Sequence, residues 1–269
     1  MTSQKKPSIL LTNDDGIKSP GLWAAAEALS KIGYVTVAAP REQSSGTGRS
    51  LPSTSDGVIT QEEMIIHGQI WKVYAVGGTP AQSVLHGILE ILEDKPDLVV
   101  SGINYGENVA SGITISGTVG AAMEAASLGI PSLAVSLATD PIHHLSYSLD
   151  VDFSTAAHFT LKFARHLLEE KLPGEIDLIK VDVPANATPE TEWEWTRLSR
   201  QRYYVPTRPQ RQDWTQPNRI GYELAMDLSI EPNDTDVFTL MSKGRVSVTP
   251  LTLDLTAGVD LKSLTRFEK

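Results

Sequence analysis

The sequence of 269 residues contains no cysteine and has fewer basic than acidic residues. Without cysteine there is no disulfide framework, no thiolate zinc site and no cysteine nucleophile. The 23 Lys and Arg against 33 Asp and Glu give a net charge of −10, which disfavours broad contact with nucleic acid or anionic lipid. Hydrophobic residues make up 41% and charged residues 21%, which is typical of a globular protein and not of a disordered one.

Long apolar runs are also missing. The least polar long stretch, residues 117–138, contains Glu124 and Pro131, so it predicts a buried helix and a buried strand and not a membrane span. Near the N-terminus, the apolar residues 9–11 are too few for the core of a signal peptide. We therefore expect that the protein does not associate with a membrane and that it is located in the cytoplasm.

Short apolar runs alternate with helical patterns through the first two thirds of the chain. The expected strands are residues 8–12, 34–39, 71–76, 97–101, 131–137 and 176–183, and the expected helices are residues 20–32, 79–92, 116–128 and 152–170. This alternation predicts an α/β fold, a doubly wound and mostly parallel sheet covered by helices on both faces. Such sheets bind ligands at the carboxyl ends of their strands.

The composition changes near Pro184. We expect an α/β catalytic core over residues 1–190 and a C-terminal extension over residues 191–269, with one late strand within residues 243–251. The extension contains five arginines among five aromatic residues: Arg197, Arg200, Arg202, Arg208, Arg211, Trp193, Trp195, Tyr203, Tyr204 and Trp214. Such a segment suits an oligomer interface or single-stranded nucleic acid. The negative net charge of the chain favours an oligomer interface over nucleic-acid binding.

Small polar residues follow four of the expected strands, at residues 13–16, 40–50, 77–80 and 102–118. Asp14 and Asp15 are adjacent, and two neighbouring carboxylates repel each other unless a cation or strong donors satisfy them. Together with Asn104 and a serine of the second loop they would suit Mg²⁺ or Mn²⁺. The alternative is a strand-to-helix turn in which these residues only cap the N-terminus of the following helix.

Ser116, Gly117 and Thr118 precede an expected helix. The first backbone N–H groups of a helix and its dipole bind anions, although a plain N-cap explains the same residues. A cation opposite an anion cradle is the arrangement of a phosphate-ester hydrolase, in which the metal polarises the phosphoryl group and lowers the pKa of water. The sequence has neither the P-loop pattern nor the GxSxG pattern.

These segments resemble the SurE family of 5′/3′-nucleotidases. The resemblance is carried by ILLTNDDGIKSPG, VAAPREQSSGTGRSL, VGGTPAQSV and DLVVSGINYGENVASGITISGTVGAAMEAASLGIPSLAVS, with weaker matches farther on. It implies a Rossmann-like core, hydrolysis of nucleoside 5′-monophosphates with 3′-monophosphates as a further candidate substrate, one divalent cation, and a homodimer or homotetramer built by the C-terminal part.

The resemblance also implies the site residues. The metal ligands would be Asp14, Asp15, Ser45 and Asn104, with Asp14 or Asp15 also catalytic, and the phosphate or substrate contacts would be Asn13, Asn108, Ser116, Gly117 and Thr118.

The chain departs from the family pattern at Ala110, Gly112, Ile115 and Gln82, where Gly, Asp, an aromatic residue or His, and Asp are usual. These departures leave open a nucleotide-binding module without turnover. An aspartyl-phosphate phosphatase is a further alternative, although its carboxylates normally stand two residues apart.

Overall fold

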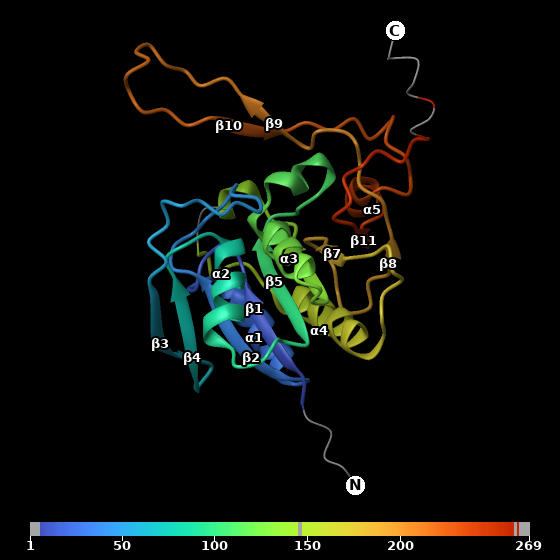
Figure 1. Ribbon diagram of the computed structural model, residues 1–269. Helices are drawn as coiled ribbons and strands as arrows, with labels where there is room; N and C mark the ends of the chain where they lie inside the picture. Colours follow the sequence, from blue (N-terminus) through green and yellow to red (C-terminus); the bar gives the residue numbers. More distant parts are fainter. Residues whose placement is uncertain (1–5, 145–146, 261–262, 264–269) are drawn as a thin grey trace.

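A central sheet of nine strands organises the protein, in the order β3-β4-β2-β1-β5-β6-β7-β11-β8 (Figure 1). The computed structural model describes residues 6–144, 147–260 and 263. The strands of this sheet are β1 (Ser8–Thr12), β2 (Tyr34–Pro40), β3 (Ile59–Ile66), β4 (Gln69–Val76), β5 (Leu98–Tyr105), β6 (Ser132–Leu137), β7 (Leu178–Val183), β8 (Trp193–Trp195) and β11 (Val246–Leu251). The pairs from β4 through β2, β1, β5 and β6 to β7 are all parallel, so the predicted α/β fold is confirmed.

The central strands are buried on both faces, which explains their uninterrupted apolar sequences. In β1, Ile9 and Leu11 belong to the core on one side of the sheet, whereas Leu10 belongs to the core on the other side. Alternate side chains of a strand point to opposite faces, so both faces need a cover.

Two pairs of helices supply that cover. The helices α1 (Pro20–Ser30) and α4 (Ser154–Glu169) pack together on one face, and α2 (Pro80–His86) and α3 (Gly117–Ser127) pack together on the other. Proline at the first turn of α1 and α2 starts each helix, where its missing N–H costs nothing. Among the described residues, no helix is long and apolar enough to cross a membrane.

The sequence analysis missed the edge strand β3. It pairs antiparallel with β4, and Ile66 stands opposite Gln69, so His67 and Gly68 form a two-residue turn with φ of 45° and 80°. Positive φ at both positions is the hairpin turn that matches the twist of the strands. The strand carries Glu62 and Glu63 and is only partly buried, so its apolar pattern is weak.

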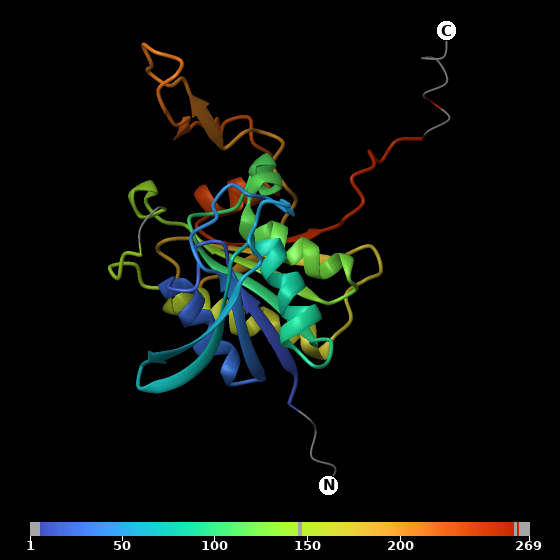
Figure 2. The same ribbon diagram turned by 60° about the vertical axis from the view of Figure 1, so that its left-hand side comes forward.

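The C-terminal part of the chain returns to the sheet. β11 lies between β7 and β8, antiparallel to the first and parallel to the second. Before it come α5 (Asp236–Met241) and the strands β9 (Tyr204–Thr207) and β10 (Gly221–Leu224). β9 and β10 pair with each other in a separate hairpin that projects from the body of the molecule (Figures 1 and 2).

Candidate active site

Hydrogen bonds to backbone carbonyls join the polar loops at the carboxyl edge of the sheet. The N–H of Ser44, in the loop after β2, donates to the carbonyl of Asp14, after β1, at 2.7 Å. The N–H of Gly48 donates to the carbonyl of Ile115 at 3.0 Å, and the hydroxyl of Thr79 donates to the carbonyl of Ser50 at 2.7 Å. Segments far apart in the sequence therefore meet at this edge, as parallel strand ends require.

Asp14 faces the N-terminus of α3. Its Oδ1 accepts a hydrogen bond from the hydroxyl of Thr118 at 2.5 Å, and its side chain is almost completely buried. Ser116 caps this helix, because its hydroxyl accepts from the N–H of Val119 at 3.1 Å. The predicted cation site and the predicted anion cradle thus share one helix terminus.

Asp15 is held by two donors from other loops. The backbone N–H of Tyr105 donates to its Oδ2 at 3.2 Å, and Nε2 of Gln43 donates to its Oδ1 at 3.1 Å. The same Gln43 nitrogen donates to the carbonyl of His144 at 2.8 Å. Gln43 was not among the predicted site residues, and only its place in the polar loop after β2 could have suggested it.

The pKa values of both carboxyl groups are perturbed. Burial raises the pKa of Asp14, although the hydrogen bond from Thr118 lowers it. Burial raises the pKa of Asp15 well above its ordinary value, and the neighbouring charge of Asp14 raises it further. Two buried carboxylates without a charge partner are costly, and no Lys or Arg in the described part of the chain forms an ion pair with either of them.

Asn104 completes the cluster of oxygen atoms. Its Nδ2 donates to the carbonyl of Tyr105 at 2.9 Å and to that of Gly106 at 2.7 Å. Its Oδ1 is therefore fixed on the other side, where the hydroxyl of Thr118 lies at 3.3 Å. Asp14 and Asn104 therefore both lie next to the hydroxyl of Thr118.

A pocket of about 460 Å³ opens above this cluster. Its lining includes five of the predicted residues: Asp14, Ser45, Asn104, Asn108 and Ser116. The remaining four predicted residues are absent from the lining. Asn13 uses its side-chain amide inside the turn, because Nδ2 donates to the carbonyl of Gly16 and Oδ1 accepts from the N–H of Gly16.

The oxygen atoms gathered here fit a hard divalent cation. Carboxylate, amide and hydroxyl oxygens are the ligands of Mg²⁺ and Mn²⁺, and Asp14, Asp15, Asn104 and Ser45 would supply them. Across residues 6–144, 147–260 and 263, no group of three His, Cys, Asp or Glu residues is suited to a metal. A site here would therefore depend on the neutral oxygens of Asn104 and Ser45.

A buried ionic cluster supports one wall of the pocket. Lys180 contacts Asp182 and lies 3.3 Å from Oδ2 of Asp236, and all three side chains are fully buried. Asp182 accepts from the N–H of Asn108 at 2.8 Å, and Asp236 accepts from the N–H of Ala110 at 2.9 Å. The cluster fixes the loop after β5, including Ala110, whose φ is +55°.

The hairpin of β9 and β10 lines the far side of the same pocket. Tyr204 and Tyr222 come from this hairpin, and Glu107 and His144 come from loops of the core. The sequence analysis did not assign these four residues to the site. No local pattern connects a hairpin with loops about 80 to 100 residues away.

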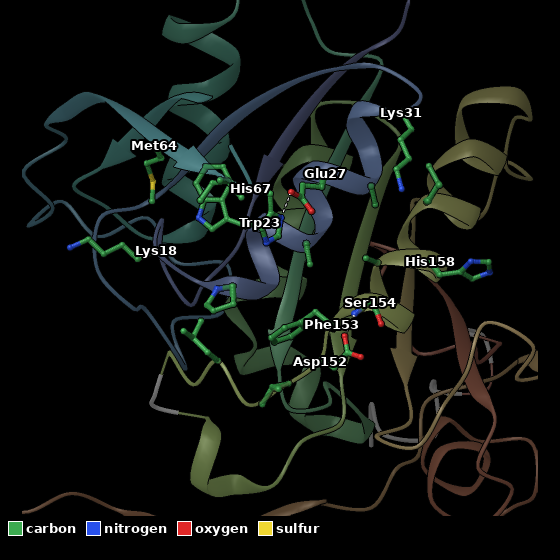
Figure 3. A pocket seen from close by; sticks show the side chains of 18 of the residues that line it. Lys18, Trp23, Glu27, Lys31, Met64, His67, Asp152, Phe153, Ser154 and His158 are labelled. Carbon is green, nitrogen blue, oxygen red and sulfur yellow. Dashed lines mark hydrogen bonds and ion pairs between the residues drawn. The ribbon is translucent and has the colours of Figure 1, made fainter. Parts of the chain in front are cut away.

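A second cavity, of about 830 Å³, lies between α1, α4 and β3 (Figure 3). Trp23, Phe153 and Met64 line it, and Nδ1 of His67 contacts the carboxylate of Glu27 there. None of the predicted site residues lines this cavity. Its size alone does not make it the reaction site.

Comparison with known proteins agrees with the sequence motifs. The family model of survival protein SurE matches residues 9–205. The chain belongs to the SurE family. It is 40% identical, over 97% of both chains, to a protein of Methanosarcina mazei named 5′-nucleotidase SurE. It is 43% identical to the protein of the same name from Thermococcus gammatolerans, over 95% of this chain and 94% of that protein.

A solved structure of the family has the same fold. The crystal structure of the SurE protein from Aquifex aeolicus matches with a TM-score of 0.76 and 34% identity, over 98% of this chain and 100% of that chain. The resemblance inferred from the sequence motifs is confirmed, and it extends through the C-terminal part.

Proposed function

We propose that this protein is a 5′-nucleotidase, a phosphomonoesterase that hydrolyses nucleoside 5′-monophosphates to nucleoside and phosphate. The names of relatives at about 40% identity support this activity. The observation that carries the proposal is the buried carboxylate of Asp14, which lines the pocket and accepts a hydrogen bond from the first turn of α3, with the equally buried Asp15 next to it in the chain.

In the proposed reaction, the phosphate group lies between Asn104 and the first turn of α3. The dipole of α3 stabilises negative charge at that point, while the hydroxyl of Thr118 donates to Asp14 and holds that carboxylate in place. Asp14 or Asp15 orients the attacking water and accepts its proton.

We propose that Asp14, Asp15, Ser45 and Asn104 hold one divalent cation, Mg²⁺ or Mn²⁺. When bound, such a cation supplies Lewis-acid polarisation of the phosphoryl oxygen and favours ionised water. Asn108 and Ser116, which line the pocket, are the proposed substrate contacts, and hydrolysis of 3′-monophosphates is part of the same proposal.

The decisive experiment measures phosphate release from AMP with Mg²⁺, with Mn²⁺ and with EDTA. Asp14→Asn is expected to lower kcat by more than about 100-fold, since even residues that only support metal ligands cost about 10- to 100-fold. Asp254→Asn, at an exposed position, is the matched control.

Each alternative gives a different result. A nucleotide-binding module without turnover binds AMP and releases no phosphate under any metal. An aspartyl-phosphate phosphatase accumulates an acid-stable phosphoenzyme during turnover. Full activity of Asp14→Asn would contradict the proposed site itself.

We also propose that the chain assembles as a homodimer or homotetramer through its C-terminal part. The hairpin projects from the body (Figure 2), and Trp214 between its strands is 87% exposed. Exposed tryptophan is enriched at protein interfaces. Sedimentation of the wild type and of Trp214→Ala tests this assembly, and a monomeric wild type would contradict it.

A further inference from the structure

The pocket above Asp14 has two chemically different ends. At one end are the polar groups of the candidate cation site, including Asn104 and Ser116. At the other end the hairpin of β9 and β10 contributes Tyr204, Pro206 and Tyr222. A volume of about 460 Å³ lies within the range of pockets that hold small organic ligands. Inorganic phosphate alone would occupy only one end.

The second end is an aromatic surface. The rings of Tyr204 and Tyr222 meet edge to face with centroids 5.2 Å apart. The rings of His144 and Tyr222 are nearly parallel, at 19°, and Nδ1 of His144 lies 3.0 Å from the hydroxyl of Tyr222. These contacts fix the rings, while Tyr222 remains 46% exposed. An ordered and partly exposed ring in a pocket is suited to stacking with a flat ligand.

Glu107 joins the polar and the aromatic parts of the lining. Its side chain is only 5% exposed, it lines the pocket, and it follows Asn104 by three residues. Oε1 accepts a hydrogen bond from the hydroxyl of Tyr204 at 3.1 Å. A carboxylate has about four acceptor positions, so Glu107 retains the capacity to accept from hydroxyl groups of a ligand.

We propose that the hairpin of β9 and β10 forms the nucleoside-binding half of the active site. The nucleobase stacks on Tyr222 beside His144, and Glu107 accepts hydrogen bonds from the sugar hydroxyls. The groups of a nucleoside monophosphate, phosphate then sugar then base, match the sequence of contacts from Asn104 through Glu107, three residues on, and its partner Tyr204 to the ring of Tyr222. This inference rests on the proposed function and adds which residues select a nucleotide over other phosphate esters.

Three substrates separate the contributions: AMP, ribose 5-phosphate, which lacks the base, and 2′,3′-dideoxyAMP, which lacks both sugar hydroxyls. The wild type is expected to prefer AMP over ribose 5-phosphate by at least about tenfold in kcat/KM, in line with the effect of base stacking on aromatic rings. Tyr222→Ala should lower kcat/KM for AMP by about tenfold, mainly through KM, and leave ribose 5-phosphate within about twofold.

Glu107→Gln tests the sugar contact. The wild type should prefer AMP over the dideoxy nucleotide by about tenfold, because hydrogen bonds to charged groups are the strong ones, and Glu107→Gln should reduce this preference to about threefold or less. Tyr34→Ala removes a tyrosine that is 64% exposed at the amino end of β2. This variant is the matched control, and its kcat/KM for all three substrates should equal that of the wild type.

The possible failures are distinguishable. A wild type that releases phosphate from none of the three substrates contradicts the proposed function and this inference with it. A wild type that hydrolyses ribose 5-phosphate as efficiently as AMP overturns the inference alone. If Tyr222→Ala lowers kcat/KM for AMP and for ribose 5-phosphate equally, the inference is also overturned, because the ring would then support the reacting end of the pocket and not the base.

Discussion

Thr118 donates its hydroxyl hydrogen to Asp14 across 2.5 Å, although 104 residues separate them in the chain. The bond joins the first turn of α3 to the end of β1 and fixes one of the two buried carboxylates. The hydroxyl of Thr118 also lies 3.3 Å from Oδ1 of Asn104. One hydroxyl group therefore sets the spacing of two candidate metal ligands.

Replacing Thr118 with valine keeps the shape of the side chain and removes the hydroxyl. We expect kcat/KM for AMP to fall by at least about tenfold and the free energy of unfolding to fall by about 1–3 kcal/mol, because a buried carboxylate loses its donor. Thr118→Ser retains the hydroxyl and should recover most of the activity. Steady-state kinetics and urea unfolding provide the measurements, and equal activity of Thr118→Val and the wild type would contradict the role.

Divalent cations should stabilise the folded protein, because a ligand that binds only the native state raises the melting temperature. We expect Mn²⁺ or Mg²⁺ to raise the Tm of the wild type and EDTA to reverse the change. Asp15→Asn should abolish the increase, and Asp254→Asn should preserve it. Scanning calorimetry measures this without any substrate, and an equal increase in Asp15→Asn would exclude Asp15 as a ligand.

Gly117 provides the space that Asp14 occupies. A Cβ at residue 117 would stand 2.7 Å from Cβ of Asp14 and 2.9 Å from its Oδ2, closer than carbon contacts allow. Gly117→Ala should therefore displace the carboxylate and lower kcat by about tenfold or more, since small misplacements cost about 100-fold in severe cases. Gly174→Ala, where nothing lies within 4 Å of the added atom, is the control, and kinetic equality of the two variants would contradict this argument.

Ala110 has φ of +55° and no exposed surface. A left-handed conformation costs an L-residue about 1–2 kcal/mol, which glycine avoids. Ala125, equally buried inside α3, should lose about 1 kcal/mol in helix propensity on replacement by glycine. We therefore expect Ala110→Gly to be less destabilising than Ala125→Gly by more than about 1 kcal/mol in urea unfolding. Equal losses of unfolding free energy in the two variants would contradict this prediction.

The cluster of Lys180 predicts a pH dependence of stability. It contains one cation and two carboxylates, and burial together with the charge of Asp236 raises the pKa of Asp182 to about 6 from its ordinary 3.8, against the influence of Lys180. A raised carboxyl pKa contributes stability that is present below about pH 4 and is lost as the pH rises through about 6.

Asp182→Asn should remove this dependence. We expect the unfolding free energy of the wild type, taken relative to the variant, to decrease by on the order of 2 kcal/mol between pH 4 and pH 6.5. Urea unfolding of both proteins at several pH values measures the difference, in which the contributions of titrating groups far from this cluster cancel. A difference that is constant with pH would contradict the prediction.

The parallel core could be predicted from the sequence because its strands are buried on both faces and read as continuous apolar runs. The edge strand β3 could not, since half of its side chains face solvent and Glu62 and Glu63 interrupt the pattern. Ser116 was correctly recognised as preceding a helix, because a capping hydroxyl is a local signal.

The candidate site likewise contains residues that could be predicted from the sequence and residues that could not. Asp14 and Asp15 come shortly after the end of β1, and Asn104 stands next to the last residue of β5, so the rule that ligands bind at strand ends points to them. Tyr222 and His144 come together through the position of the hairpin relative to the core, which depends on packing between distant segments and leaves no periodic trace in the sequence. Gln43 supports Asp15 by a single side-chain hydrogen bond, and nothing in its neighbours marks that role.

The position of β11 between β7 and β8 determines how the chain can be shortened. A protein ending at residue 190 would leave the hydrogen-bonding edge of β7 unpaired, on a strand whose apolar residues Ile179, Val181 and Val183 are fully buried in the intact protein. Such an edge is a template for pairing with other chains. Truncation there would therefore yield insoluble aggregates instead of an isolated catalytic core. In the intact protein, β11 pairs with this edge and prevents it from pairing with another chain.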